Sequence, residues 1–322
     1  MLRFTLVCLS LLCLGHGSFA QDSDPIRDDY RPKVAEFGME TLMDYHTATS
    51  SESQNTAQNE VDWDRLYKAK IAIPLIIRSE RMAGLQLKYY QHRFFFDEES
   101  YVDDFGYYSH LNNSRFTSLG VRGFLQDTYK DGSRLKVIAG AETKSDRLKW
   151  TRNSAKYFFS GIYTWRRDRR TELGVGFVTN YDVRIFNVYP VFIYKKQFQR
   201  GYFLDLYLPK AIKLRKRINQ SNFLIASTQV RGWRYNMTNA LEGENRDLTL
   251  RKADLQFNIA YEREIHDWLW LGIEAGYNHN IRYYLSEPGM RRNDAIVNIR
   301  SGDAKYCKVS IFLVPPRKLM NL

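Results

Sequence analysis

Alternation of apolar and polar side chains is the main pattern of this chain. From Val34 to Tyr45, the residues Ala35, Phe37, Met39, Thr41, Met43 and Tyr45 fall on one face of an extended strand, and Glu36, Gly38, Glu40 and Asp44 fall on the other. One such face suits lipid and the other suits water, because successive side chains of a strand point to opposite sides. The pattern recurs about a dozen times, which is typical of a transmembrane β-barrel.

We predict strands at residues 34–45, 65–78, 83–96, 115–128, 133–143, 156–166, 171–179, 184–197, 201–217, 222–235, 248–262, 268–284 and 304–314. At roughly 10 to 14 residues each, tilted strands of this length can cross the hydrocarbon layer. No run of eighteen apolar residues follows the first twenty residues, so a helical span is not expected. The predicted fold class is all-β, a closed antiparallel transmembrane barrel of 12 to 14 strands.

The connections between these strands alternate in length. The long polar ones (46–64, 97–114, 144–155, 236–247, 285–303) are predicted external loops, and the short ones (79–82, 129–132, 167–170, 263–267) are predicted periplasmic turns. With thirteen strands, the segment 236–247 lands on the wrong side of the membrane. Splitting 201–217 at Pro209 into two strands restores the alternation and gives fourteen, whereas an unbroken strand there and a false one elsewhere gives twelve. Pro74, Pro190 and Pro209 are expected to mark bulges or bends, since proline removes a ladder donor.

The residues at the two ends of the chain predict segments that lie outside the barrel. Arg3, an apolar run to Leu14 and small residues at Ser18 and Ala20 predict a signal peptide over 1–20, which implies export by the general secretory route. Its removal takes away one cation, so the formal charge falls from +12 to +11, and Cys307 alone remains of the three cysteines. We expect a short disordered periplasmic lead at 21–33, the barrel at 34–314 and a tail at 315–322. The predicted location is the bacterial outer membrane, with outer-membrane lipid, lipopolysaccharide and the barrel-assembly machinery as partners.

Aromatic residues cluster near the predicted strand ends, where rings with a polar edge favour the headgroup zone. This favours a membrane girdle over the core of a secreted β-sandwich, the remaining alternative fold. The girdle set is Tyr89, Tyr90, Phe94, Phe95, Phe96, Trp150, Trp165, Tyr181, Trp233, Tyr235, Trp268, Trp270, Tyr283 and Tyr284.

The segments Tyr189–Arg217, with its two prolines, Gly232–Tyr235 and Tyr261–Tyr277 resemble an uncharacterised family of Gram-negative outer-membrane β-barrel proteins. The resemblance covers most of residues 30–315 and implies a barrel, but it brings no catalytic residue. One feature departs from many outer-membrane barrels: the chain continues beyond Phe312 instead of ending in an aromatic residue.

Catalytic and metal chemistry find little support. The five histidines after the signal are scattered, and the sequence contains no G-x-S-x-G, no H-E-x-x-H and no cysteine pair in the expected mature chain. We therefore expect no enzyme activity, no cofactor and no metal. The basic runs 166–170 and 213–217 lie at predicted turns or strand ends, where cations reach toward lipid headgroups, so nucleic acid is not an expected partner.

The predicted lumen face is weighted toward cations, which favour anions in a water-filled pore. The candidate lumen-lining residues are Lys68, Lys70, Arg78, Lys88, Arg122, Arg134, Lys136, Glu36, Glu40 and Asp44. Opposite charges could instead pair across the lumen and fill it. The predicted function is a passive, porin-like pore or small-solute transporter with a preference for small anions. The alternative is a non-conducting structural or surface-interaction barrel acting through loops such as the acidic segment Asp97–Asp104.

Overall fold

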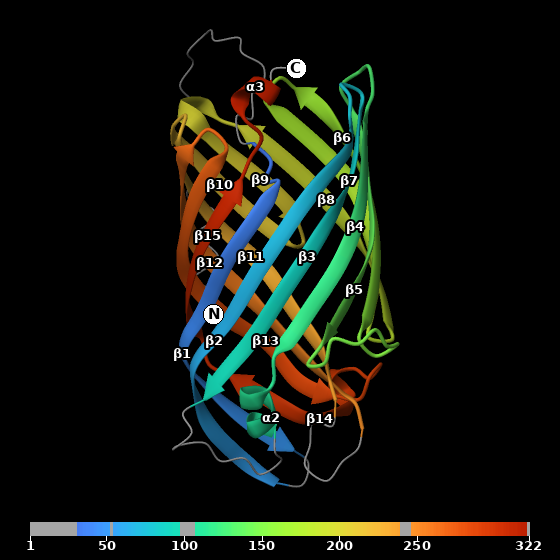
Figure 1. Ribbon diagram of the computed structural model, residues 1–322, viewed down its shortest axis with the longest axis vertical. Helices are drawn as coiled ribbons and strands as arrows, with labels where there is room; N and C mark the ends of the chain where they lie inside the picture. Colours follow the sequence, from blue (N-terminus) through green and yellow to red (C-terminus); the bar gives the residue numbers. More distant parts are fainter. Residues whose placement is uncertain (1–30, 52–53, 97–106, 239–245, 321–322) are drawn as a thin grey trace, which may run out of the picture.

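The computed structural model describes residues 31–51, 54–96, 107–238 and 246–320. The predicted signal peptide, most of the predicted lead and the acidic segment 97–104 lie outside this description. Fourteen of the fifteen strands form a closed ring in which chain neighbours pair antiparallel, and β1 closes it by pairing with β15 (Figure 1). The strands are β1 (Ala35–Ser51), β2 (Gln54–Ile77), β3 (Arg81–Phe96), β4 (Phe116–Thr128), β5 (Arg134–Ser145), β6 (Ala155–Asp168), β7 (Thr171–Asp182), β8 (Ile185–Gln197), β9 (Tyr202–Leu208), β10 (Ala211–Asn219), β11 (Asn222–Met237), β12 (Leu248–His266), β13 (Leu269–Ser286), β14 (Ala295–Ser301) and β15 (Ala304–Leu313).

Within the described residues, two helices and two 3-10 turns accompany the strands: α2 (Tyr107–Asn113), α3 (Arg317–Met320), η1 (Gln199–Gly201) and η2 (Arg292–Asp294). Helix α3 lies at the end of the barrel that carries the short connections, here called the turn end, and α2 lies at the opposite loop end (Figure 1). No helix in the described ranges is long and apolar enough to cross a membrane.

The outer face of the ring is apolar, as the alternation predicts. Phe37 and Met39 on β1 are 49% and 39% exposed, whereas Glu36 and Glu40 between them are buried inside. The same division runs around the wall, with exposed side chains that include Leu85, Leu87, Leu119, Val121, Val175, Phe177, Ile259, Ile273, Val309 and Ile311. A closed ring with an apolar outside and a polar inside is the architecture of a transmembrane β-barrel of the outer-membrane type, because closure leaves no free edge in lipid.

The strand count resolves at Pro209. Strands β9 and β10 form a hairpin whose turn contains Pro209 and Lys210, so the segment 201–217 is two short strands. The prediction of fourteen ring strands is confirmed, and the twelve-strand alternative is wrong. Pro74 lies at a register shift between β2 and β3, which confirms the predicted bulge.

Asp44 interrupts the alternation in β1. It adopts a left-handed backbone conformation with φ of 53°, and the register with β2 skips it, passing from Met43 to Tyr45. Aspartate tolerates this conformation better than most residues. This left-handed residue turns Tyr45 inward, where it is 2% exposed, and leaves the Asp44 side chain outside. The prediction that Asp44 lines the lumen and that Tyr45 faces lipid is therefore wrong.

The predicted external loops at 46–64 and 285–303 are partly strand. β1 continues to Ser51 and β2 begins at Gln54, so the two project together beyond the membrane belt as a long hairpin. The fifteenth strand, β14, pairs with β1 over Thr47–Ser50 and with β13. Periodicity missed these extensions because they carry no lipid-facing apolar row, whereas backbone pairing needs none.

An apolar core fills the barrel at the loop end. It comprises Leu42, Tyr45, Val61, Phe94, Phe96, Tyr107, Tyr108, Leu111, Phe116, Tyr235, Met237, Leu248, Leu250, Tyr283, Leu285, Val297, Ile299, Ala304 and Tyr306. Helix α2 contributes three of these side chains, and the Tyr107 and Tyr283 hydroxyls are hydrogen-bonded at 2.9 Å. The assignment of Phe94, Phe96, Tyr235, Tyr283 and Tyr284 to a membrane girdle is therefore wrong, because all five are at most 5% exposed. Trp150, Tyr157 and Trp268 do face outward.

The loop-end section is also narrower than the rest. Asn236 of β11 pairs with Ser145 of β5 across the positions where β6 to β8 would stand, and the Asp146 N–H donates to the Asn236 carbonyl at 3.2 Å. Strands β6, β7 and β8 end below this contact. The barrel thus has a wide section toward the turn end and a filled, narrower section toward the loop end.

Candidate functional site

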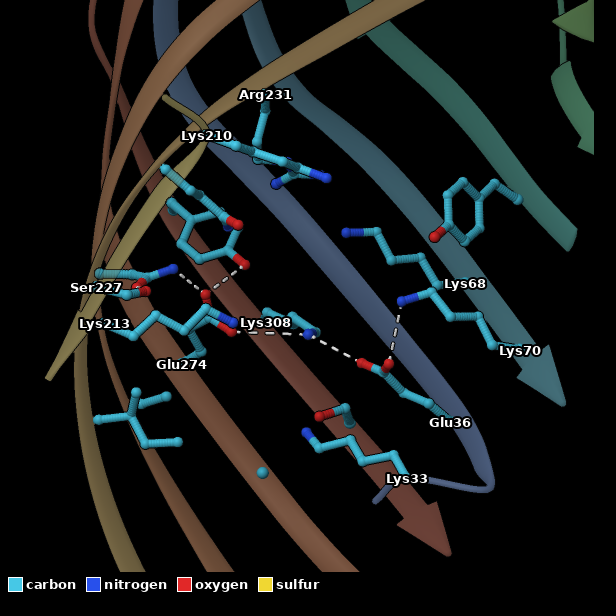
Figure 2. Close-up of a pocket in the computed structure, with 18 of the residues that line it drawn as sticks. Lys33, Glu36, Lys68, Lys70, Lys210, Lys213, Ser227, Arg231, Glu274 and Lys308 are labelled. Carbon is cyan, nitrogen blue, oxygen red and sulfur yellow. Dashed lines mark hydrogen bonds and ion pairs between the residues drawn. The ribbon is translucent and has the colours of Figure 1, made fainter. Parts of the chain in front are cut away.

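The wide section of the barrel encloses a basic cavity of about 760 Å³. Thirteen of its lining residues are Lys or Arg and four are Asp or Glu. The cations are Lys33, Lys68, Lys70, Lys88, Arg122, Lys144, Lys156, Lys195, Lys210, Lys213, Arg215, Arg231 and Lys308, and the acids are Glu36, Asp205, Glu262 and Glu274. Figure 2 shows side chains from distant strands converging on this space.

Two acids on opposite sides of the β15 strand each bind cations of the cavity wall. The Glu36 carboxylate accepts from Lys70 Nζ at 3.2 Å and from Lys308 Nζ at 3.1 Å (Figure 2). Lys308 also lies 3.6 Å from Glu274, whose carboxylate accepts from the Tyr306 hydroxyl at 3.0 Å. These pairs connect β1, β2, β13 and β15 and hold their inward side chains in place.

Two further acids are buried in the wall. The Glu40 carboxylate accepts from both Lys68 and Arg231, whose strands lie across the lumen from each other. Glu142 accepts from Lys88 Nζ at 2.8 Å and pairs with Lys144 at 3.2 Å. Both carboxylates are at most 3% exposed. Their negative charge is therefore neutralised by these partners and does not balance the positive charge of the other cavity cations.

Several cavity cations lack such a partner. The side chains of Lys210 and Lys213 make no ion pair or hydrogen bond with any residue in the described ranges, and Arg122 lies over the Phe158 ring at 4.9 Å. A cavity with low-dielectric walls and an excess of one charge raises the local concentration of the opposite ion. The site therefore suits anions. The described part of the chain contains no group of three His, Cys, Asp or Glu arranged to hold a metal ion.

The structure places five of the ten candidate lumen residues in the cavity wall: Lys68, Lys70, Lys88, Arg122 and Glu36. Glu40 lies behind them, and Arg134 lines a smaller space of about 90 Å³ near the turn end. Lys136 shares the inward face of β5 with Arg134 but lies outside both linings. Arg78 does not line the lumen, because β2 ends at Ile77 and Arg78 is exposed in the following turn.

The candidate set missed most of the cations of the second half of the chain, including Lys210, Lys213, Arg231 and Lys308. Arg231 and Lys308 alternate with outward-facing residues, so the pattern applied to β2 could have found them. Lys210 carries no such signal, because it lies in a turn whose position inside the wall depends on the split at Pro209.

The turn end of the cavity is bordered by the described end of the predicted lead. Arg31 Nη1 donates to Asp267 Oδ1 at 2.9 Å and to the Pro315 carbonyl at 2.9 Å, and Lys33 Nζ donates to Glu262 Oε1 at 2.7 Å. Lys33 is one of the cavity-lining cations. The segment before β1 thus contacts the inner wall at this end.

No protein-family model matches the chain, and no curated protein does either. The resemblance to an uncharacterised outer-membrane family therefore stays a prediction. Similar solved structures include a FadL homologue from Pseudomonas aeruginosa, at 10% identity, covering 87% of this chain and 90% of that one, with a TM-score of 0.44. The translocator domain of the autotransporter NalP from Neisseria meningitidis is 10% identical, covers 88% and 90% of the two chains, and has a TM-score of 0.38.

An active-site mutant of outer membrane phospholipase A from Escherichia coli is 13% identical, covers 91% and 94% of the two chains, and has a TM-score of 0.34. One fold can host many unrelated functions. The function of this chain must therefore be argued from its own site.

Proposed function

We propose that the protein is an outer-membrane barrel of a Gram-negative bacterium that conducts small anionic solutes through its basic cavity. The observation that carries this proposal is the excess of thirteen cationic over four acidic residues in the cavity lining. The apolar outer belt supports a membrane location, with lipid and lipopolysaccharide around it, since only a closed barrel or a helix satisfies its backbone in lipid.

The apolar core at the loop end stands across the direct path out of the cavity. Helix α2 supplies the part of this core that does not belong to the barrel wall, because Tyr107, Tyr108 and Leu111 insert from a loop. We infer that conduction requires α2 to leave the barrel. Replacing these three side chains by Ala removes the apolar contacts that hold the helix and keeps every ring strand.

Planar-bilayer recording of the refolded protein across a KCl gradient tests the proposal. We expect few openings from the wild type and frequent openings from the Tyr107→Ala/Tyr108→Ala/Leu111→Ala variant. In both proteins the reversal potential should shift toward the equilibrium potential of chloride. Adding Lys210→Gln and Lys213→Gln to that variant should reduce the anion preference without closing the channel. A reversal potential shifted toward the equilibrium potential of potassium would contradict the proposal.

The filled loop end also favours the alternative function, a non-conducting structural or surface-interaction barrel. The core and the narrowing at Asn236 and Ser145 would then serve to seal the barrel. The same recordings separate the two functions, since this alternative expects silence from the wild type and from the α2 variant alike.

A further inference from the structure

The wall of the barrel is interrupted between β8 and β11. The β9–β10 hairpin that stands between these strands pairs with β8 only from Phe192 onward and with β11 only up to Gln229. Beyond the hairpin tip, Ile185–Val191 of β8 pairs with β7 alone, and Arg231–Tyr235 of β11 pairs with β12 alone. Two strand edges therefore face each other without pairing, and we call this interruption the lateral window.

The lateral window is closed at both ends. Toward the turn end, Val230 N–H donates to the Lys210 carbonyl at the hairpin tip at 2.9 Å. Toward the loop end, Arg234 Nη1 donates to the Asp182 carbonyl at 2.7 Å and lies 3.4 Å from its carboxylate, so β11 reaches the β7–β8 turn. The gap is a bounded opening and not a slit that runs out of the barrel.

The depth of the window follows from the aromatic residues beside it. In the strand register, Phe186 stands opposite Tyr181, which stands opposite Tyr157, and Tyr157 packs against Trp150 in the outward-facing girdle of the loop end. Seven residues of β8 from Ile185 rise about 20 Å along a tilted strand, or about 15 Å along the membrane normal. That is about half of a hydrocarbon layer of about 30 Å, so the window faces the outer leaflet.

The two sides of the window differ in polarity. Outward side chains at its rim are apolar and exposed: Phe186 at 64%, Val188 at 59% and Val230 at 41%. Inside, the basic cavity reaches the rim, because its lining includes Lys210, Val230 and Gly232. Figure 2 shows Lys210 and Arg231 at the same end of the cavity. Unpaired strand edges at membrane depth are tolerated where they border a water-filled cavity, which fits this arrangement.

We propose that the lateral window binds a single-chain amphiphile with an anionic head group, a carboxylate or a phosphate. Its head lies among the cations at Lys210, and its alkyl chain passes between β8 and β11 into the outer leaflet. The proposal rests on the anion-binding role of the cavity given above and adds a membrane route to it. Pro190 and Pro209, two residues of the segment that carries the family resemblance, lie in the free edge of β8 and in the hairpin tip.

Glycines provide a matched pair of variants. A Cβ added at Gly232, on the β11 edge of the window, meets only the Lys252 carbonyl at 4.0 Å, so Gly232→Trp adds its ring at the outer mouth of the gap without strain. A Cβ added at Gly123 on β4 meets only Leu85 at 3.9 Å, and β4 is paired on both sides. Gly123→Trp therefore adds the same ring to an intact part of the wall.

The test uses the full chain in phosphatidylcholine nanodiscs at pH 8, with spin-labelled stearate as the anionic probe and spin-labelled phosphatidylcholine as the reference lipid. Electron paramagnetic resonance gives the motionally restricted fraction of each probe. We expect the wild type and Gly123→Trp to restrict stearate far more than the reference, and Gly232→Trp to restrict both probes equally. Lys210→Gln should weaken stearate binding about tenfold, since it removes a charged hydrogen-bond donor.

Inorganic phosphate separates a free anion from an amphiphile as the preferred ligand. Displacement of stearate from the wild type by phosphate supports a head-group site inside the cavity. Equal stearate binding by Gly232→Trp and Gly123→Trp overturns the window, even if the bilayer recordings show anion conduction. Conversely, selective stearate binding by a protein that does not conduct leaves the window in place and refutes only the pore.

Discussion

Glu40 offers the sharpest test of how the lumen charges stabilise the barrel. Its carboxylate is 3% exposed and binds Lys68 and Arg231, which are 11% and 13% exposed. Replacing Glu40 by Gln removes two charge-assisted hydrogen bonds, each contributing about 1.5 to 3 kcal/mol, and leaves two buried cations facing each other. We expect the free energy of unfolding to fall by about 3 to 5 kcal/mol, the usual result of removing one partner of a buried ion pair.

Asp44→Asn is the matched control, since it removes one negative charge from the same strand. Asp44 pairs with Lys305 at 3.1 Å, but the two side chains are 65% and 72% exposed, so the loss should stay below about 1 kcal/mol. Asn also tolerates the left-handed backbone at this position.

Urea unfolding in detergent micelles, followed by tryptophan emission, measures both variants. The double variant Glu40→Gln/Arg231→Gln should recover part of the loss, because the excess cation is removed together with the acid. Similar losses for Glu40→Gln and Asp44→Asn, within about 1 kcal/mol of each other, would refute the reasoning that burial makes the Glu40 cluster structurally important.

Two further changes address other parts of the wall. Gly84→Ala places a methyl group 2.5 Å from the Ile73 carbonyl oxygen and 2.7 Å from the Phe124 ring, so urea unfolding should show a loss of about 1 to 3 kcal/mol that Gly123→Ala does not. At the loop end, burial opposes ionisation of Asp146, but hydrogen bonds from His110, the Thr238 N–H and the Ser145 hydroxyl hold its pKa below the ordinary value. A lowered folded-state pKa stabilises the protein above the unfolded value of about 3.9 and loses this contribution as pH falls through the folded value. Asp146→Asn should therefore be less stable than the wild type at pH 7, and the difference in unfolding midpoint should shrink as pH falls below about 4; a difference that does not change with pH would contradict the prediction.

Most of the ring could be predicted from alternation, because each ring strand must present one face to lipid over its whole crossing. Connection lengths then located the error in the count, and Pro209 located the split. The same signal fails where a strand leaves the membrane: β14 and the outer part of the β1–β2 hairpin pair through their backbones without an apolar row. A single residue in a left-handed conformation, Asp44, reverses the facing of the strand beyond it without any periodic signal.

The alternation of side chains could not predict whether a charged residue inside the barrel is closed off by a partner or lines the cavity. Glu40 and Glu36 are four residues apart on one face, yet Glu40 is closed off by Arg231, 191 residues later in the chain, while Glu36 lines the cavity. Such partners depend on the curvature of the closed ring. The aromatic residues near strand ends show the same difficulty, because Phe94 and Tyr283 fill the loop-end core instead of a girdle.

The lateral window and the excess of cations in the cavity both depend on the short length of the β9–β10 hairpin. Unpaired backbone groups in hydrocarbon cost several kcal/mol each, and a hairpin about six residues longer in each arm would pair both free edges. That longer hairpin would also carry Lys210 away from the cavity toward the loop end, because Lys210 is at its tip. The short hairpin therefore does two things at once: it opens the wall toward the outer leaflet and it delivers a cation to the opening. Because an uncompensated ammonium group favours an anionic head group, and because the chain of a bound amphiphile excludes water from the gap, a ligand that satisfies the cation should also reduce hydrogen exchange along β8 and the free edge of β11. In Lys210→Gln, the Val188 and Tyr189 amides should lose protection from hydrogen exchange, and bound stearate should no longer restore it. That result would show that the free strand edges and the Lys210 cation act as one site.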